Sequence, residues 1–546
     1  MKGILAAALL LAQGSWQPVQ AQFFKRYWEA GRGPAVEIFS AKTLSISGDQ
    51  SELIMAGEWL DQREMQAVRG FVMRTSLQGE AGWVHTFYTN SVSGVNGLKI
   101  NTLCSDSDGS ALIGGSSFQS WAPGSGAERF IAKVNVDGSL AWARMQSENE
   151  VNAIAPDVRP GQFAVLSGPD GHLAPLRSLL AYRITTEGDW IDGMSLITGA
   201  DDQPGQIFAQ ADGSYRVTGN HDTAGVPGPM LIGLDEELMP RWGWVYRSPG
   251  ETWTLRASAV RERTAALTGT LRGAEEHGFL ILTHAEGEAR IARTYTLATG
   301  AHIELRAVAA TEDGWLLAGS SYDPQQPSQR RSIVIQTDAD GEPIAAVSYF
   351  EPSLTDYDLA ETATSLQYAE EQGIILVGGE LVKSIGGQTD RRLIWAVQDL
   401  IPVRNLEEGS GACGTMVQVR SERRYVESHD LNITPQPGGG LNGFGLLEGQ
   451  ERFTDFRCSG HLQFPDAAQQ DLNRSTPLDP AAAAVPVQVR CLDAQGRIIG
   501  EWPWQTGMQA ASLMPRTAPA GVYVWIWLSR DGSVLRREKT VHASSR

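Results

Sequence analysis

The chain has 546 residues, of which 42% are hydrophobic and 20% are charged, as in folded proteins. Its formal net charge of −18 at pH 7 argues against a nucleic-acid partner, because binding to a phosphate backbone needs clustered lysines and arginines. The length exceeds that of one ordinary hydrophobic core, so we expect several domains or a repeat array.

Residues 1–21 have the pattern of a secretory signal peptide. Lys2 supplies the positive start, residues 4–12 form the apolar run, and Val-Gln-Ala at 19–21 is a small-residue cleavage pattern. We therefore expect export into the periplasm and a mature chain that begins at Gln22. No later stretch reaches the roughly 18 apolar residues that a membrane-spanning helix needs, so we expect no transmembrane segment.

A five-residue pattern that ends in glycine recurs along residues 43–400. Two examples are LIMAG at 53–57 and WLLAG at 315–319. The glycines lie 50 to 59 residues apart, at Gly57, Gly115, Gly168, Gly219, Gly269, Gly319 and Gly378. Such a regular period is the signature of a repeat architecture.

Each repeat has room for four strands. One strand precedes the glycine pattern, the pattern itself is the second, and a hairpin of two strands follows. The hairpin turns end in a glycine, which indicates a positive φ, at Gly79, Gly138, Gly188, Gly287 and Gly341. Four strands in about 50 residues describe one propeller blade.

We therefore predict an all-β fold with a seven-bladed β-propeller over residues 22–404. A linear β-solenoid is the alternative. The seventh repeat lacks its glycine turn, and residues 22–28 resemble an outer strand, so we expect the N-terminal strand to complete the last blade. This closure would remove an open sheet edge.

Tryptophans recur at matching places in the outer strands, and we expect them to fill the space between blades rather than to bind ligand. They are Trp83, Trp142, Trp190, Trp242 and Trp244. The repeat also resembles secreted propellers of Bacteroidota, through GWLLAGSSYD at 314–323, IVIQTDADGEPI at 333–344 and FIAKVNVDGSLAW at 130–142. This resemblance implies an architecture and a setting, and it names no ligand.

Residues 405–475 contain short apolar alternations and a glycine-rich stretch, PQPGGGLNGFG. We interpret them as a small β module held by a disulfide between Cys413 and Cys458, or alternatively as a spacer. Cys104 lies within a repeat strand and is expected to be a small buried hydrophobe. No C-x-x-C pair occurs, which argues against a zinc knuckle or a redox motif.

Residues 476–546 resemble the type A C-terminal sorting domain of the type IX secretion system. The resemblance rests on VQVRCLDAQGRIIG, on a Gly-x-Tyr strand and on a final glycine turn with a basic strand. The matching residues are Asp493, Gly496, Arg497, Gly521, Tyr523, Gly532 and Lys539. It implies an immunoglobulin-like β-sandwich that is recognised by outer-membrane secretion machinery, and a protein released or tethered at the cell surface. The alternative is an accessory domain that itself binds something.

No catalytic, cofactor or metal motif stands out. The stretches SDSDG at 105–109 and TDADG at 337–341 hint at calcium, but neither continues to the glutamate of an EF-hand loop, and both lie where a blade needs a turn. The carboxylate pairs of glycoside hydrolases leave no local signature, so such an activity stays open.

Ligand sites on such scaffolds concentrate on long loops, here those between the second and third strands of each repeat. Candidate ligand-binding residues on these loops are Trp59, Trp121, His221, Asp222 and Tyr322. Our leading hypothesis is a secreted or cell-surface binding or adhesion module for a carbohydrate or protein. The alternatives are a polysaccharide hydrolase or lyase with its site in the propeller funnel, and a structural component of a surface complex.

Overall fold

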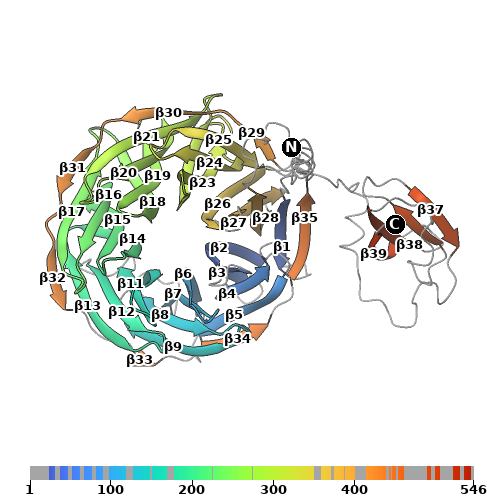
Figure 1. Ribbon diagram of the computed structural model, residues 1–546, viewed down its shortest axis with the longest axis horizontal. Coiled ribbons are helices and arrows are strands. Elements are labelled where there is room, and N and C mark those ends of the chain that lie inside the picture. The colour runs from blue at the N-terminus through green and yellow to red at the C-terminus, as the bar shows by residue number, and fades with distance from the viewer. Residues whose placement is uncertain are drawn as a thin grey trace, which may run out of the picture. The chain divides into compact units, whose positions relative to one another are not determined.

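The computed structural model describes residues 97–349, apart from 119–126, 148–149, 169–177, 224 and 274, together with separate strands between 24 and 89 and between 358 and 542. These residues form strands and turns and no helix. The strands up to residue 459 make six hydrogen-bonded sheets arranged around a ring (Figure 1). The fold is therefore a β-propeller, which confirms the predicted all-β repeat architecture.

Five of the sheets follow one plan, in which four consecutive strands run from the centre outwards and a fifth strand lies outside them. Their inner four strands are β2 (Glu37–Ile46), β3 (Glu52–Asp61), β4 (Ala67–Ser76) and β5 (Ala81–Thr89); β6 (Gly97–Ser105), β7 (Ala111–Phe118), β8 (Ala127–Val134) and β9 (Leu140–Ser147); β10 (Glu150–Pro156), β11 (Gln162–Gly168), β12 (Leu179–Thr185) and β13 (Trp190–Ile197); β14 (Asp201–Ala209), β15 (Tyr215–Thr223), β16 (Val226–Leu234) and β17 (Pro240–Arg247); and β18 (Thr252–Arg261), β19 (Thr264–Arg272), β20 (Glu276–Thr283) and β21 (Ala289–Leu297).

The sixth sheet has ten strands and combines two repeats. Its repeat strands are β22 (His302–Ala310), β23 (Gly314–Tyr322), β24 (Arg330–Asp338), β25 (Pro343–Tyr349), β26 (Asp358–Ala369), β27 (Ile374–Ile385), β28 (Gln388–Asp399) and the N-terminal β1 (Phe24–Ala30). β1 pairs antiparallel with β28, with Phe24 opposite Val397. A single parallel pair, Arg330 with Ala360, joins the two repeats, so strand pairing yields six sheets where the sequence predicts seven blades.

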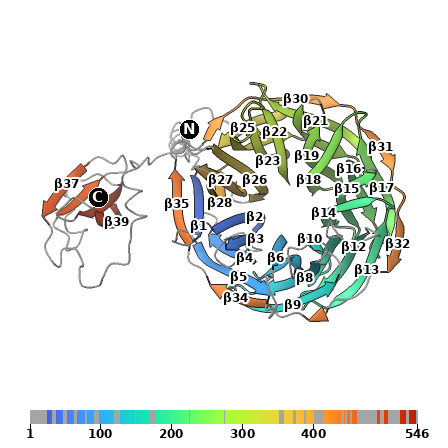
Figure 2. The same cartoon turned by 180° about the vertical axis from the view of Figure 1, so that it is seen from behind.

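The remaining strands of the ring come from residues 414–459, which we call the strap. Its strands are β29 (Gly414–Met416), β30 (Val419–Arg424), β31 (Glu427–Asp430), β32 (Thr434–Pro437), β33 (Asn442–Gly443), β34 (Leu446–Gln450) and β35 (Phe453–Ser459). They pair in turn with β25, β21, β17, β13, β9, β5 and β1. The strap thus follows the outer rim against the direction of the repeats (Figure 2). We expected a small β module or a spacer here, and the described strands form no sheet of their own.

In the repeats that begin with β6, β18 and β22, the recurring glycine is explained by a β-bulge in the innermost strand. In β22 the register shifts between Leu305 and Ala307, directly opposite Gly319. A Cβ atom on Gly319 would lie 1.9 Å from the carbonyl oxygen of Glu304. The same approach occurs at Gly115, with 1.8 Å to Lys99 O, and at Gly269, with 2.0 Å to Thr254 O. Only glycine fits where a bulged backbone comes this close.

Neighbouring sheets are joined by aromatic side chains at the rim. The indole Nε1 of Trp83 donates to Val136 O at 2.9 Å, that of Trp142 to Thr186 O at 3.0 Å, and that of Trp244 to Glu286 O at 2.7 Å. Each acceptor belongs to a hairpin turn of the next sheet. The turn glycines have positive φ, as predicted, at Gly138, Gly188, Gly287 and Gly341. The rim tryptophans therefore act in packing, and the hydrophobic core lies between adjacent sheets.

The described C-terminal strands form one separate four-stranded antiparallel sheet. Its order is β37 (Ile498–Pro503), β36 (Gln488–Leu492), β38 (Gly521–Leu528) and β39 (Val534–His542). The chain divides into two compact units between Arg457 and Cys458, and this sheet belongs to the second. The described strands after residue 459 form a single sheet, whereas the predicted sandwich needs two.

Candidate functional site

Tyr322 is buried instead of exposed, because β23 and β24 extend into the stretch that we expected to be a loop. It is 6% exposed, and its hydroxyl donates to Glu276 Oε2 at 2.7 Å. Its ring packs edge-on against His302, with centroids 5.5 Å apart, and the guanidinium of Arg330 lies 4.4 Å from the ring centre. Tyr322 is therefore part of a packed polar cluster and offers no open stacking surface.

His221 and Asp222 lie at the end of β15 and differ in their partners. His221 is buried, with Nδ1 2.8 Å from Asp202 Oδ1, and the Thr198 hydroxyl donates to the same carboxylate. Asp222 is half-buried, and its Oδ1 has no hydrogen-bond partner within the described part of the chain. Asp222 thus keeps a carboxylate oxygen that no described residue engages.

Several predicted residues lie outside the description of the structure. Trp59 is placed in β3 by its backbone alone, and Trp121 lies outside the described residues. The candidate disulfide between Cys413 and Cys458 falls outside the described side chains as well. Of the sorting-motif residues, Gly521 and Tyr523 lie in β38 and Lys539 in β39, again as backbone only, whereas the rest fall in undescribed segments: Asp493, Gly496, Arg497 and Gly532. Cys104 is buried with a free thiol, as expected, and burial raises its pKa to about 12.

A cluster of charges surrounds Glu304 near the inner edge of the sixth sheet. Glu304 is 5% exposed, and its Oε1 accepts from Arg306 Nε at 3.0 Å and Nη2 at 2.9 Å. Its Oε2 accepts from Arg330 Nη1, whose guanidinium also covers the ring of Tyr322. Through Tyr322 the contacts continue to Glu276. We call Glu304, Arg306, Arg330, Tyr322 and Glu276 the Glu304 cluster.

The geometry of the cluster sets the protonation states of Glu304 and Tyr322. Burial raises the pKa of Glu304, but the charges and hydrogen bonds of Arg306 and Arg330 outweigh it, so the pKa lies below its usual value. Burial and the hydrogen bond to Glu276 raise the pKa of the Tyr322 hydroxyl. At neutral pH the carboxylate is therefore ionised and the phenol protonated. Such a cluster is suited to holding charge and poorly suited to exchanging protons.

The sequence contains a signal for this cluster that our prediction missed. Gln206, Arg256 and Arg306 each lie 13 residues before a recurring glycine, at the bulge of an innermost strand. Two arginines at that position stand out in an acidic protein. Their nearness to carboxylates could be found only from the folded ring.

A pocket of about 420 Å³ lies between the sheets of β14–β17 and β18–β21. Its lining includes three arginines and four carboxylates: Arg216, Arg241, Arg263, Asp212, Asp235, Glu236 and Glu286. Arg216 is buried and donates through Nη2 to the carbonyls of Arg263 and Ala285, at 2.7 and 2.9 Å. It fixes two turns of the next sheet and thereby joins the sheets.

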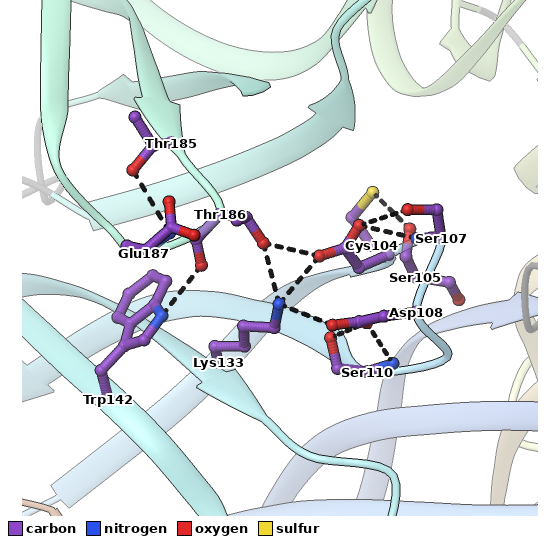
Figure 3. A network of polar contacts seen from close by, with 11 residues as sticks. Cys104, Ser105, Ser107, Asp108, Ser110, Lys133, Trp142, Thr185, Thr186 and Glu187 are labelled. Atoms are coloured by element: carbon purple, nitrogen blue, oxygen red, sulfur yellow. Dashed lines mark hydrogen bonds and ion pairs between the residues drawn. The ribbon is translucent and has the colours of Figure 1, made fainter. Parts of the chain in front are cut away.

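The stretch SDSDG forms a turn whose aspartates bind a lysine. Lys133 Nζ lies 2.9 Å from Asp106 Oδ2, 3.0 Å from Asp108 Oδ2 and 2.8 Å from Thr186 Oγ1 in the next sheet (Figure 3). Figure 3 also shows Trp142 donating to the backbone of Thr186. The ammonium group occupies the place between the carboxylates that a calcium ion would need, which favours the turn interpretation. Within the described ranges, no group of three or more potential ligands has metal-binding geometry.

The second stretch, TDADG, is a turn of the same kind. Asp338 Oδ1 accepts from the backbone N–H groups of Asp340 and Glu342, at 2.9 and 2.8 Å. This is the side-chain turn that aspartate typically forms. Both candidate calcium stretches thus have a structural role.

No protein-family model matches the chain, and no curated protein matches it in sequence. In the described portion of the chain, no helix is long and apolar enough to cross a membrane. The functional argument therefore rests on the geometry of the propeller and on the resemblances within the sequence.

Proposed function

We propose that the protein is a secreted or cell-surface β-propeller that acts as a binding or adhesion module. The propeller fold supports this, since its rigid sheets carry loops on which ligand sites concentrate. The observation that carries the proposal over the hydrolytic alternative is the state of the Glu304 cluster. Its two carboxylates are engaged by arginines and a tyrosine hydroxyl, and the arginines lower the pKa of Glu304, whereas glycoside hydrolysis needs a proton-donating carboxyl group with a raised pKa.

The test of this function is a binding screen on the mature exported protein. The protein is applied to an array of polysaccharides and extracellular proteins. In parallel, soluble polysaccharides are assayed for new reducing ends or unsaturated products. Together the two assays distinguish a binding module from a hydrolase or lyase. Retention on one ligand class without turnover supports the binding module. Turnover of any polysaccharide would favour the hydrolase or lyase, and co-purification with fixed partners without ligand retention would favour the structural role.

We also propose that the ring has seven blades, with the ten-stranded sheet made of two. Each half of that sheet repeats the four-strand antiparallel order of the other five, and each half receives one strap strand, β29 or β35. Only the pair of Arg330 with Ala360 joins the halves. An experimental map of the ring should have seven-fold pseudosymmetry, and six-fold pseudosymmetry would contradict the count.

We propose further that the C-terminal domain is a type IX sorting domain of sandwich form that directs export after signal-peptide cleavage. The support is the spacing of the sequence blocks and the apolar strand β38, in which Gly521 opens the strand that carries Tyr523. The intact mass of the protein from the medium and the cell surface tests this proposal. We expect a chain that begins near Gln22 and lacks about 70 C-terminal residues. A full-length tail on the exported protein would instead favour a binding role for this domain.

A further inference from the structure

Two arginines occupy the same structural position in neighbouring innermost strands. Arg256 is the extra residue of the bulge in β18, between Leu255 and Ala257, and Arg306 is its counterpart in β22. β18 and β22 are the innermost strands of their sheets, nearest the centre of the ring, and they pack against each other (Figure 1). The repeat therefore places the two arginines at matching positions of neighbouring strands.

Arg256 is exposed, although the residues on either side of it in β18 are buried. Among the described residues, none forms a hydrogen bond or an ion pair with it. Burial of the surroundings and the charge of Arg306 lower the pKa of its guanidinium. Arg256 is thus a cation in partly desolvated surroundings whose hydrogen-bond donors are unused.

The charges near Arg256 do not balance. Among the described residues, Arg272 and Arg306 act on Arg256, and Arg330 adds a fourth arginine through its bond to Glu304, against the carboxylates of Glu276 and Glu304. These carboxylates already accept from Tyr322, Arg306 and Arg330. An excess of positive charge in a protein of net charge −18 attracts an anion, and a planar guanidinium binds an oxyanion through two parallel hydrogen bonds.

We propose that Arg256 and Arg306 form an oxyanion-binding site on the innermost strands β18 and β22, which takes a carboxylate, phosphate or sulfate group of the ligand. Glu304 and Arg330 position Arg306, because the shared carboxylate fixes its guanidinium. This inference rests on the proposed binding function and gives it a ligand class, an anionic one. The bulges that create the site are the same ones that require the recurring glycines Gly269 and Gly319.

The test is calorimetric titration of the mature full chain with three probes: trigalacturonate, its neutral counterpart galactotriose, and inorganic phosphate. We expect binding of at least one anionic probe and none of galactotriose. Arg256→Gln should weaken that binding by about tenfold or more, because a hydrogen bond to a charged group is lost. Arg256→Lys should fall between, since it keeps the charge without the planar fork.

Arg290→Gln is the matched control, since Arg290 is an exposed arginine of β21, the outer repeat strand of the same sheet, paired with Asp340 at 3.1 Å. It should bind as the unchanged protein does. Binding of phosphate alone would assign the site to phosphate- or sulfate-type ligands. Binding of trigalacturonate would assign it to carboxylate ligands. Binding of neither probe, or equal binding by Arg256→Gln, overturns the site. Galactotriose binding that is unaffected by Arg256→Gln would leave the binding function standing while the anionic class falls.

Discussion

Replacing Gly319 by alanine tests whether the bulge is the reason for the repeat. The added Cβ would lie 1.9 Å from Glu304 O and 2.8 Å from the Cα of Leu305, and both are backbone atoms that no rotamer change can move. Restoring a contact of about 3.4 Å requires β22 to move away from β23 by roughly 1.5 Å, which exceeds what the ladder hydrogen bonds tolerate. We expect the variant to lose about 3 kcal/mol or more of unfolding free energy.

Gly273→Ala is the matched control. Its Cβ would meet only the side chain of Glu251, at 3.7 Å, so the substitution should be neutral or slightly stabilising, by about 0.5 kcal/mol. Urea unfolding followed by tryptophan fluorescence measures both variants against the parent, with buried Trp315 of β23 among the reporters. If the two variants are equally stable, the close approach of the bulge is not what requires glycine.

Three further predictions concern Lys133 and Trp142 in the sheet of β6–β9, which contact Asp106 in that sheet and Thr186 in the next one. Lys133→Met leaves the buried carboxylate of Asp106 without its cation and should lower the free energy of unfolding, measured in urea, by about 2–3 kcal/mol. Adding Asp106→Asn should recover part of this loss, and strictly additive losses would contradict the pairing. Burial raises the pKa of Asp106, but the bonds to Lys133 and Thr186 outweigh burial, so the pKa lies below its usual value. The stabilisation by this pair is therefore present above about pH 4 and is lost as pH falls through the lowered pKa. The difference in unfolding free energy between parent and Lys133→Met should therefore shrink below about pH 4, and a constant difference would count against this assignment. Trp142→Phe removes the hydrogen bond to the carbonyl of Thr186 and should cost about 1 kcal/mol by the same assay, whereas an unchanged stability would show that the indole only fills space.

Features that depend on local geometry could be predicted from the sequence. Glycine is needed at position 188 because the φ there is +79°. A glycine recurs at the same position of the hairpin in other repeats, and this pattern predicts the turn. The rim position of Trp142 follows from the period of the repeat for the same reason. Such requirements involve a few neighbouring residues and therefore leave a readable pattern.

The strap and the Glu304 cluster could not be predicted, because both depend on residues brought together by the closed ring. The strap strands β29, β31 and β33 have 3, 4 and 2 residues, too few for a hydrophobic alternation, and they exist because each sheet offers an unpaired outer edge. We expected Tyr322 in the long loop between the second and third strands of its repeat, yet the hairpin of β23 and β24 continues to that residue. Strand ends are set by pairing partners more than by composition.

The strap has a consequence for how the chain leaves its folded body. Because it runs against the order of the repeats, it finishes at β35 beside β1, so the first and the last strand of the ring are neighbours. A protease cut after residue 459 would detach the downstream residues and leave every strap strand paired. A cut between β32 and β33 would instead divide the strap into two parts, each still paired with several sheets. Cleavage after residue 459 should therefore leave all strand pairs of the ring intact, and a single cut in the strap should leave its strands paired with their sheets.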